Sequence, residues 1–167
     1  MRNHTFTLYQ SRFDNYGRPT TLPWQQWVED YFSKHDVRGT IEDSSDKKVL
    51  DAMKDGLGAV LGVIREGLGH KKANVEEIHA LSLDIEDRTD EQVYAALDVL
   101  SPYHYAAWTT HKHGSIVAGG YARIRVIIPL AEPLDPQKLS SVWTRMNAFV
   151  GEVNDPQTKD LSRVNFF

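Results

Sequence analysis

One apolar segment, residues 78–86 (IHALSLDIE), constrains the fold of this 167-residue chain more than any other. It is typical of a buried strand, and side chains on a strand alternate between two faces. The leucines and isoleucine at odd positions therefore share one face, while the other face ends in two carboxylates, Asp84 and Glu86. Neighbouring carboxylates repel each other and lose hydration, so the fold must supply a positive partner.

A divalent metal ion is one candidate for that partner. Mg²⁺ and Mn²⁺ bind carboxylate oxygens, and one or two carboxylates with substrate phosphates form the usual magnesium arrangement. The alternative is a strand that runs out into solvent among further charged residues, Asp87, Arg88 and Asp90. The acidic pair alone leaves both interpretations open.

Two arginines on a second expected strand, residues 122–130 (ARIRVIIPL), are the next candidates. Arg123 and Arg125 point to one face of that strand, and Pro129 is expected to end it. Two cations on one face need anions. They are expected to form salt bridges with the acidic pair, to lie on a solvated face, or to clamp phosphate, which guanidinium groups bind well.

Histidines gather in residues 109–115 (TTHKHGS). His111 and His113 share a face if the preceding strand continues, and they suit a polar strand end, a transition-metal site or a phosphate site. A His-hydrophobic-His centre of a rolling-circle nuclease is a further possibility. That motif needs an apolar residue where Lys112 stands and a tyrosine on a later helix, whereas Tyr121, the only later tyrosine, falls in an expected loop.

The segment 154–163 (NDPQTKDLSR) adds two more carboxylates. Asp155 before proline is typical of a turn. Asp160 precedes an expected strand over residues 162–167, and we expect this strand to join the sheet of the acidic pair. Asp160 would then be a third metal ligand.

The remaining segments complete an α+β pattern, with an edge strand at 6–14, strands at 58–67 and 104–111, and helices at 23–35, 45–55, 90–100 and 135–151. From residue 78 the order β-α-β-β-α-β is that of a ferredoxin-like, RNA-recognition-motif-like sheet. Its helices would cover one face and leave the other free for ligands. Residues before it form an N-terminal α/β extension.

Composition narrows the class of protein. A formal net charge of −4 argues against a wrapped, high-affinity nucleic-acid complex, but not against an enzyme that meets nucleic acid locally. The absence of cysteine removes disulfides and thiolate metal sites. We see no transmembrane run or secretion signal, so we expect a cytoplasmic protein with no membrane partner. The last residues look like an interrupted strand, which suggests an N-terminal fragment.

Taken in order, these motifs resemble the archaeo-eukaryotic primase superfamily, and more narrowly the primase-polymerase domains of plasmid, phage and integrative-element replication proteins. The segments that carry the resemblance are 81–86 (LSLDIE), 109–113 (TTHKH), 123–136 (RIRVIIPLAEPLDP) and 155–163 (DPQTKDLSR), supported by 6–19 and 71–81. The resemblance implies one primase-polymerase catalytic domain over residues 1–167.

The resemblance also implies site residues. The family's Asp-x-Asp motif matches Asp84-Ile85-Glu86, with glutamate as a departure, and its small-x-His motif matches Thr109-Thr110-His111. Asp84, Glu86 and Asp160 would hold two Mg²⁺ or Mn²⁺ ions, with Asp155 as the rival of Asp160 for the third motif and His111 completing the catalytic set. The implied nucleotide-binding residues are Thr110, His111, Lys112, His113, Arg123, Arg125 and Arg163.

The implied activity is template-directed nucleotidyl transfer, with nucleoside triphosphates and a single-stranded DNA template as partners. A helicase or primase C-terminal module often follows in such relatives. The first rival is a non-catalytic nucleic-acid-binding module, which needs exposed aromatic residues on the sheet face. Its difficulty is that the acidic pair on that face would repel phosphates. The rolling-circle nuclease is the second rival.

Overall fold

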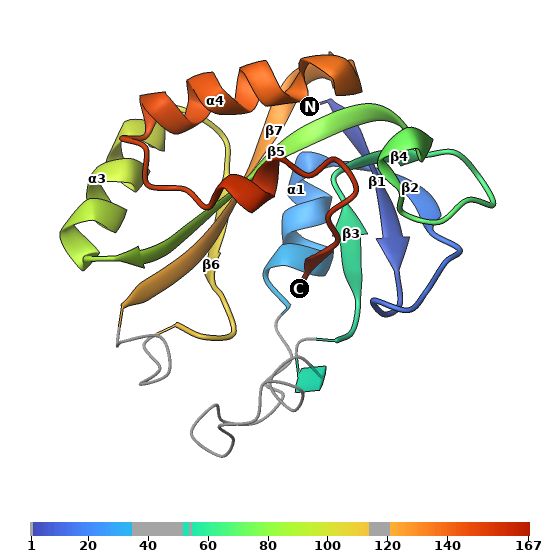
Figure 1. Ribbon diagram of the computed structural model, residues 1–167, viewed down its shortest axis with the longest axis horizontal. Helices are drawn as coiled ribbons and strands as arrows, with labels where there is room; N and C mark the ends of the chain where they lie inside the picture. The colour runs from blue at the N-terminus through green and yellow to red at the C-terminus, as the bar shows by residue number, and fades with distance from the viewer. Residues whose placement is uncertain (1, 35–51, 54, 114–120) are drawn as a thin grey trace.

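The computed structural model describes residues 2–34, 52–53, 55–113 and 121–167 (Figure 1). Its strands are β1 (Asn3–Tyr9), β2 (Arg18–Pro23), β3 (Gly58–Val60), β4 (Gly62–Ile64), β5 (Val75–Arg88), β6 (Ala106–Thr109), β7 (Ala122–Leu134) and β8 (Asn165–Phe166). Its helices and helical turns are α1 (Trp24–Trp27), η1 (Val28–Phe32), η3 (Lys72–Asn74), α3 (Asp90–Leu100), η5 (Pro136–Lys138), α4 (Leu139–Phe149) and η6 (Pro156–Lys159).

The strands form two four-stranded sheets, ordered β2-β1-β3-β8 and β4-β5-β7-β6. Every pairing in both sheets is antiparallel. This is the expected α+β architecture, and the order β5-β7-β6 is that of the first, third and second strands of a ferredoxin-like sheet. The long β5 strand lies beside β7, and α3 and α4 pack over the sheet that contains them (Figure 1).

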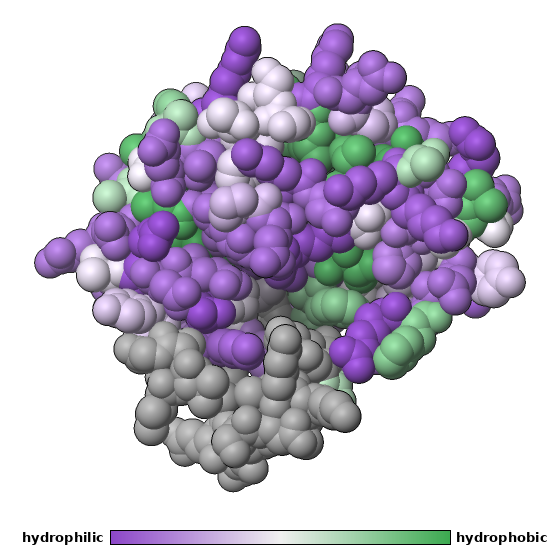
Figure 2. Space-filling view, viewed as in Figure 1, coloured by the Kyte–Doolittle hydropathy of each residue, from purple (hydrophilic) through white to green (hydrophobic). Residues whose placement is uncertain are grey.

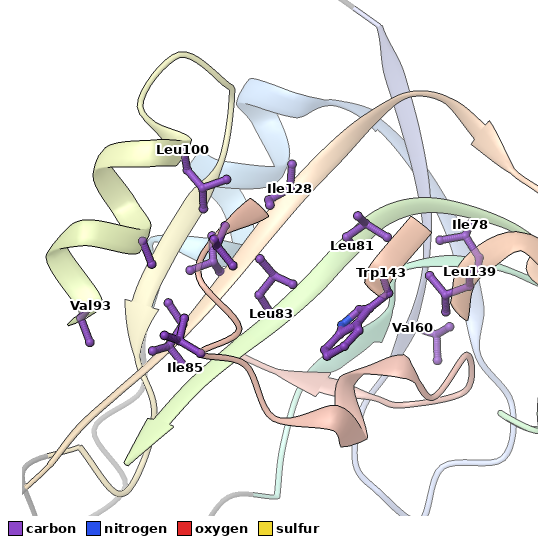
Figure 3. Close-up of a cluster of buried hydrophobic side chains, with 14 of the residues drawn as sticks. Val60, Ile78, Leu81, Leu83, Ile85, Val93, Leu100, Ile128, Leu139 and Trp143 are labelled. Atoms are coloured by element: carbon purple, nitrogen blue, oxygen red, sulfur yellow. The ribbon is translucent and has the colours of Figure 1, made fainter. Parts of the chain in front are cut away.

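The apolar face of β5 builds the main core. Leu81, Leu83 and Ile85 are almost completely buried, as strand alternation predicted. They pack with apolar residues from α3 and α4, including Leu100 and Trp143 (Figure 3). Burial of such side chains is worth about 1.5–3 kcal/mol each, which fixes the face that β5 turns toward the helices.

The opposite face of this sheet is covered along part of its length, rather than free for ligands as expected. Ala80, Ala106 and Ile127 pack there against aromatic residues of β1, α1 and η1, including Trp27 and Phe32. The aromatic residues of the expected 23–35 helix supply this cover. Beyond this contact the strands carry the opposite pairs Asp84–Arg125 and Glu86–Arg123.

The fourth strand of the ferredoxin-like order is not the one expected. β8 pairs with β3 in the other sheet, and β4 takes the position beside β5. The expected single strand over 58–67 is divided into β3 and β4 because the chain crosses between sheets at Leu61. A Cβ at Gly62 would collide with the carbonyl oxygen of Glu77, so this close approach requires glycine.

Two smaller expectations are also corrected. β1 lies between β2 and β3, so it is an internal strand and not an edge. β7 continues past Pro129, which faces Ala80 where the β5–β7 register shifts. An irregular position of this kind tolerates a residue that has no N–H to donate.

The expected helix over 45–55 lies mostly outside the described residues, as does most of the expected loop after His113. In the part of the chain that the structure describes, no helix is long and apolar enough to cross a membrane. The face turned to the viewer is mainly hydrophilic, with hydrophobic residues in separate patches (Figure 2).

Candidate functional site

The register of β5 against β7 brings the acidic and basic residues together. Asp84 lies directly opposite Arg125, and Glu86 lies directly opposite Arg123. Residues directly opposite each other on antiparallel strands point to the same face. The expectation that Asp84 and Glu86 share a face is therefore confirmed, and both arginines lie on that face with them.

Asp84 is completely buried and is held by two arginines. Arg125 donates from Nε to Oδ1 at 2.7 Å and from Nη2 to Oδ2 at 2.9 Å, and Arg163 donates to Oδ2 at 2.7 Å. Burial raises the pKa of Asp84, but the hydrogen bond and charge of Arg125, together with the charge of Arg163, lower it to a net value below the usual one. The positive partner of this carboxylate is thus a pair of guanidinium groups.

The C-terminal segment supplies another part of this cluster. Asn154 forms a β-bridge with Ile85, and the backbone N–H of Asp155 donates to the carbonyl oxygen of Asp84 at 2.8 Å. Nη1 of Arg163 is 3.9 Å from Oδ2 of Asp155. Arg163 therefore lies between the carboxylates of Asp84 and Asp155. Asp155 also has the turn role expected of it, since its Oδ1 accepts from the N–H of Gln157 at 2.9 Å.

A second arginine–carboxylate group lies at the end of β5. Arg123 donates to Glu86 Oε2 at 3.0 Å and to Asp87 Oδ1 at 2.6 Å. Asp87 has φ of 57°, uncommon for a residue other than glycine, and the β5–β7 register shifts between Glu86 and Arg88. This irregularity turns Asp87 toward Arg123, whereas regular alternation would place it on the opposite face. No pattern in the local sequence predicted this contact between Asp87 and Arg123.

The sequence predicts His111 on a strand next to the acidic pair, but the structure places the histidine segment one strand farther away. It follows β6, and β7 stands between β6 and β5. The Thr110 N–H donates to the Arg123 carbonyl at 2.8 Å, and the Arg123 N–H donates to Nδ1 of His113 at 3.1 Å. His111 is in the turn after β6, so it is not on a strand adjacent to the acidic pair. Backbone hydrogen bonds tie this turn to Arg123.

Lys112 and Tyr121 are the residues that bear on the rolling-circle nuclease alternative. Lys112 lies in the same turn as His111, and both are partly buried. Tyr121 is exposed and immediately precedes β7, outside any helix. The tyrosine that the rolling-circle motif requires on a later helix is not provided by this residue.

Asp160 does not take the position expected for it. That expectation rested on β8 joining the sheet of β5, which is wrong because β8 pairs with β3. Oδ1 of Asp160 accepts from the N–H and hydroxyl of Ser162, and Nζ of Lys72 is 3.8 Å away. Burial raises the pKa of Asp160, but the Ser162 hydrogen bonds and the charges of Lys72 and Arg163 lower it overall.

The residues at this site meet one requirement of a magnesium or manganese centre. Carboxylate oxygens are the ligands that these hard cations prefer; Asp84 and Asp155 share Arg163 as a partner, and Glu86 pairs with Arg123. In the described residues, however, no three His, Asp or Glu side chains are grouped so that they could hold a metal ion. These oxygen donors suit such a cation, but both oxygens of Asp84 are engaged by Arg125 and Arg163.

Fold and site together define a class: an α+β domain whose central antiparallel strands carry paired carboxylates and arginines on one face. The chain belongs to the VapE N-terminal domain family, whose model matches residues 2–167. A comparison with curated proteins finds no match.

One solved structure, the AEP domain of the cyanophage S-2L primase-polymerase (PrimPol), is similar to this chain. Its sequence identity is 15% and its TM-score is 0.47, over 99% of this chain and 71% of that one. The family agrees with the resemblance to primase-polymerase domains of phage and plasmid replication proteins.

Proposed function

We propose that this domain is a primase-polymerase, a nucleotidyltransferase that makes or extends primers on a single-stranded DNA template. The observation that carries this proposal is the cross-strand array in which Asp84 faces Arg125 and Glu86 faces Arg123. Such an array offers ligands for a divalent cation and, directly beside them, donors for phosphate oxygens. A nucleoside triphosphate with its metal ions presents both complementary groups.

The carboxylates of Asp84, Glu86 and Asp155 would hold the cations. When bound, Mg²⁺ or Mn²⁺ supplies the charge that activates a primer 3′-hydroxyl and stabilises the leaving pyrophosphate. Asp155 takes the third position in place of Asp160, because Arg163 already connects it to Asp84. Both aspartates cap a turn, Asp155 through the N–H of Gln157 and Asp160 through Ser162, so the link through Arg163 is what favours Asp155.

The basic residues would bind and orient the triphosphate. Arg123, Arg125 and Arg163 present guanidinium groups, which match phosphate oxygens in two-point hydrogen bonds. The turn after β6 adjoins Arg123 and contributes Thr110, His111, Lys112 and His113 at the same end of the sheet. In this proposal the domain acts in the cytoplasm on replicating DNA, in concert with a helicase or primase C-terminal module.

Primer extension by the purified domain tests this function. A labelled primer on a single-stranded template is incubated with deoxy- or ribonucleoside triphosphates, and with Mg²⁺ or Mn²⁺. Metal-dependent lengthening of the primer supports the proposal. An intact domain that lengthens no primer in any of these combinations contradicts it.

The burial of Asp84 favours one alternative function. A fully buried, doubly paired carboxylate is also what a purely structural ion pair looks like, and the same fold would then be a non-catalytic nucleic-acid-binding module. DNA binding with no nucleotide incorporation is the outcome that would select this alternative.

A further inference from the structure

The ion pairs around Asp84 place a condition on the proposed function, on which this inference rests. We propose that Arg125 and Arg163 block the binding of divalent cations to Asp84 until a triphosphate draws the guanidinium groups away. The domain would then bind cation and triphosphate cooperatively, and each alone only weakly.

The first support is that Asp84 has no accessible oxygen. Its side chain is 0% exposed, and the two guanidinium groups engage both carboxylate oxygens at 2.7–2.9 Å. A cation can reach Asp84 only if at least one arginine leaves. An arginine that leaves gives up its charge-assisted hydrogen bonds to Asp84, and phosphate oxygens can replace them.

The second support is the balance of charge. Across the site the carboxylates of Asp84, Glu86, Asp87 and Asp155 face the guanidinium groups of Arg123, Arg125 and Arg163. A divalent cation alone would add positive charge to this nearly balanced cluster. A triphosphate alone would meet the carboxylates and be repelled. Bound together, they exchange arginine–carboxylate pairs for arginine–phosphate and cation–carboxylate pairs.

Arg163 is the arginine best placed to move. Its side chain is 25% exposed, against 11% for Arg125, and it comes from the C-terminal segment rather than from the centre of the sheet. It also lines a cavity of about 30 Å³, next to Ser82 and Asn165. Arg125 lies in the β5–β7 ladder and makes the two-point contact with Asp84, so it holds the carboxylate more firmly.

Measurement of Mn²⁺ binding tests this inference without relying on activity. Free Mn²⁺ is followed by electron paramagnetic resonance with the wild-type domain, with and without the non-hydrolysable analogue α,β-methylene-dATP. A protein-free series corrects for Mn²⁺ held by the analogue itself. We expect the analogue to tighten Mn²⁺ binding by the domain about 10- to 100-fold, within the usual range of coupling between ligands.

Two variants locate the cause of the coupling. Arg163→Gln should bind Mn²⁺ alone about 10-fold more tightly than wild type, since it removes one arginine from Asp84. Arg145→Gln removes the same charge from an exposed position of α4 and should behave as wild type. If Arg163→Gln does not fold, the wild-type comparison alone still decides the question.

The outcomes separate this inference from the proposed function. Wild-type domain that binds Mn²⁺ equally tightly with and without the analogue overturns the inference and leaves the proposed function standing. A domain that binds no Mn²⁺ even with the analogue overturns both. Coupling in wild type that is reduced in Arg163→Gln supports the inference.

Discussion

Arg125 and Asp84 face each other across β7 and β5, and one guanidinium group engages both oxygens of one buried carboxylate. Few other contacts in the described residues join two charges so far from water. Replacing both partners of such a pair with apolar residues is often neutral, whereas removing one leaves an uncompensated buried charge. The pair therefore makes the fold sensitive to single substitutions at this site, whatever its chemistry.

The first prediction concerns stability. Asp84→Asn leaves Arg125 and Arg163 without their buried anion, so the free energy of unfolding should fall by about 3–5 kcal/mol. Asp160→Asn changes a carboxylate that is 43% exposed, and its loss should be about 1 kcal/mol or less. Urea unfolding of the two variants gives the comparison. Equal losses would mean that the Asp84 pairs are not the strong contacts described here.

The second prediction concerns pH. Burial lowers the pKa of His4, a backbone hydrogen bond with His79 partly offsets this, and the charges of His79 and Arg2 lower it further. The folded protein thus binds this proton less readily than the unfolded chain. The contribution of neutral His4 is present above the unfolded pKa of about 6.5 and is lost as pH falls below it.

Substitution of His4 should reduce that pH dependence. His4→Gln is expected to lose less stability than wild type when thermal unfolding is compared between about pH 7.5 and pH 5. His104→Gln alters an exposed histidine and serves as the control. A His4→Gln profile that runs parallel to wild type would show that His4 does not carry the effect.

The third prediction distinguishes the two C-terminal carboxylates. Asp155→Asn should reduce primer extension by about 100-fold, because it removes a carboxylate proposed to hold the cations that stabilise the leaving pyrophosphate. Asp160→Asn should retain most of the activity, since that side chain bonds to Ser162 and lies near Lys72. Circular dichroism checks that both variants fold. The reverse pattern would restore Asp160 as the third ligand.

The sequence could predict a charged face on each of the two strands, with Asp84 and Glu86 on β5 and Arg123 and Arg125 on β7. Strand alternation fixes that Asp84 and Glu86 point away from the core, and the same rule puts Arg123 and Arg125 on one side of their strand. The sequence left three roles open for the arginines, and salt bridges with the acidic pair were one of them. Only the β5–β7 register, which joins residues about forty positions apart in the chain, selects the salt bridges.

Other features were beyond local reasoning. The final strand pairs with β3, because β4 already occupies the position beside β5, and for this reason we propose Asp155 rather than Asp160 as the third carboxylate. Asp87 reaches Arg123 through an irregular backbone that breaks the alternation of the strand. Both depend on contacts between distant segments, and periodicity within one segment does not contain that information.

The most direct test of the central claim compares two glutamates of the same strand. Glu86 pairs with Arg123 in the charged face, and Glu76 pairs with Arg65 near the start of β5, each at 3.0 Å. Initial rates of metal-dependent primer extension are measured for Glu86→Gln and Glu76→Gln beside wild type. We predict that Glu86→Gln is slower by about 100-fold or more and that Glu76→Gln matches wild type. An equally active Glu86→Gln domain would contradict the claim that this face transfers nucleotides.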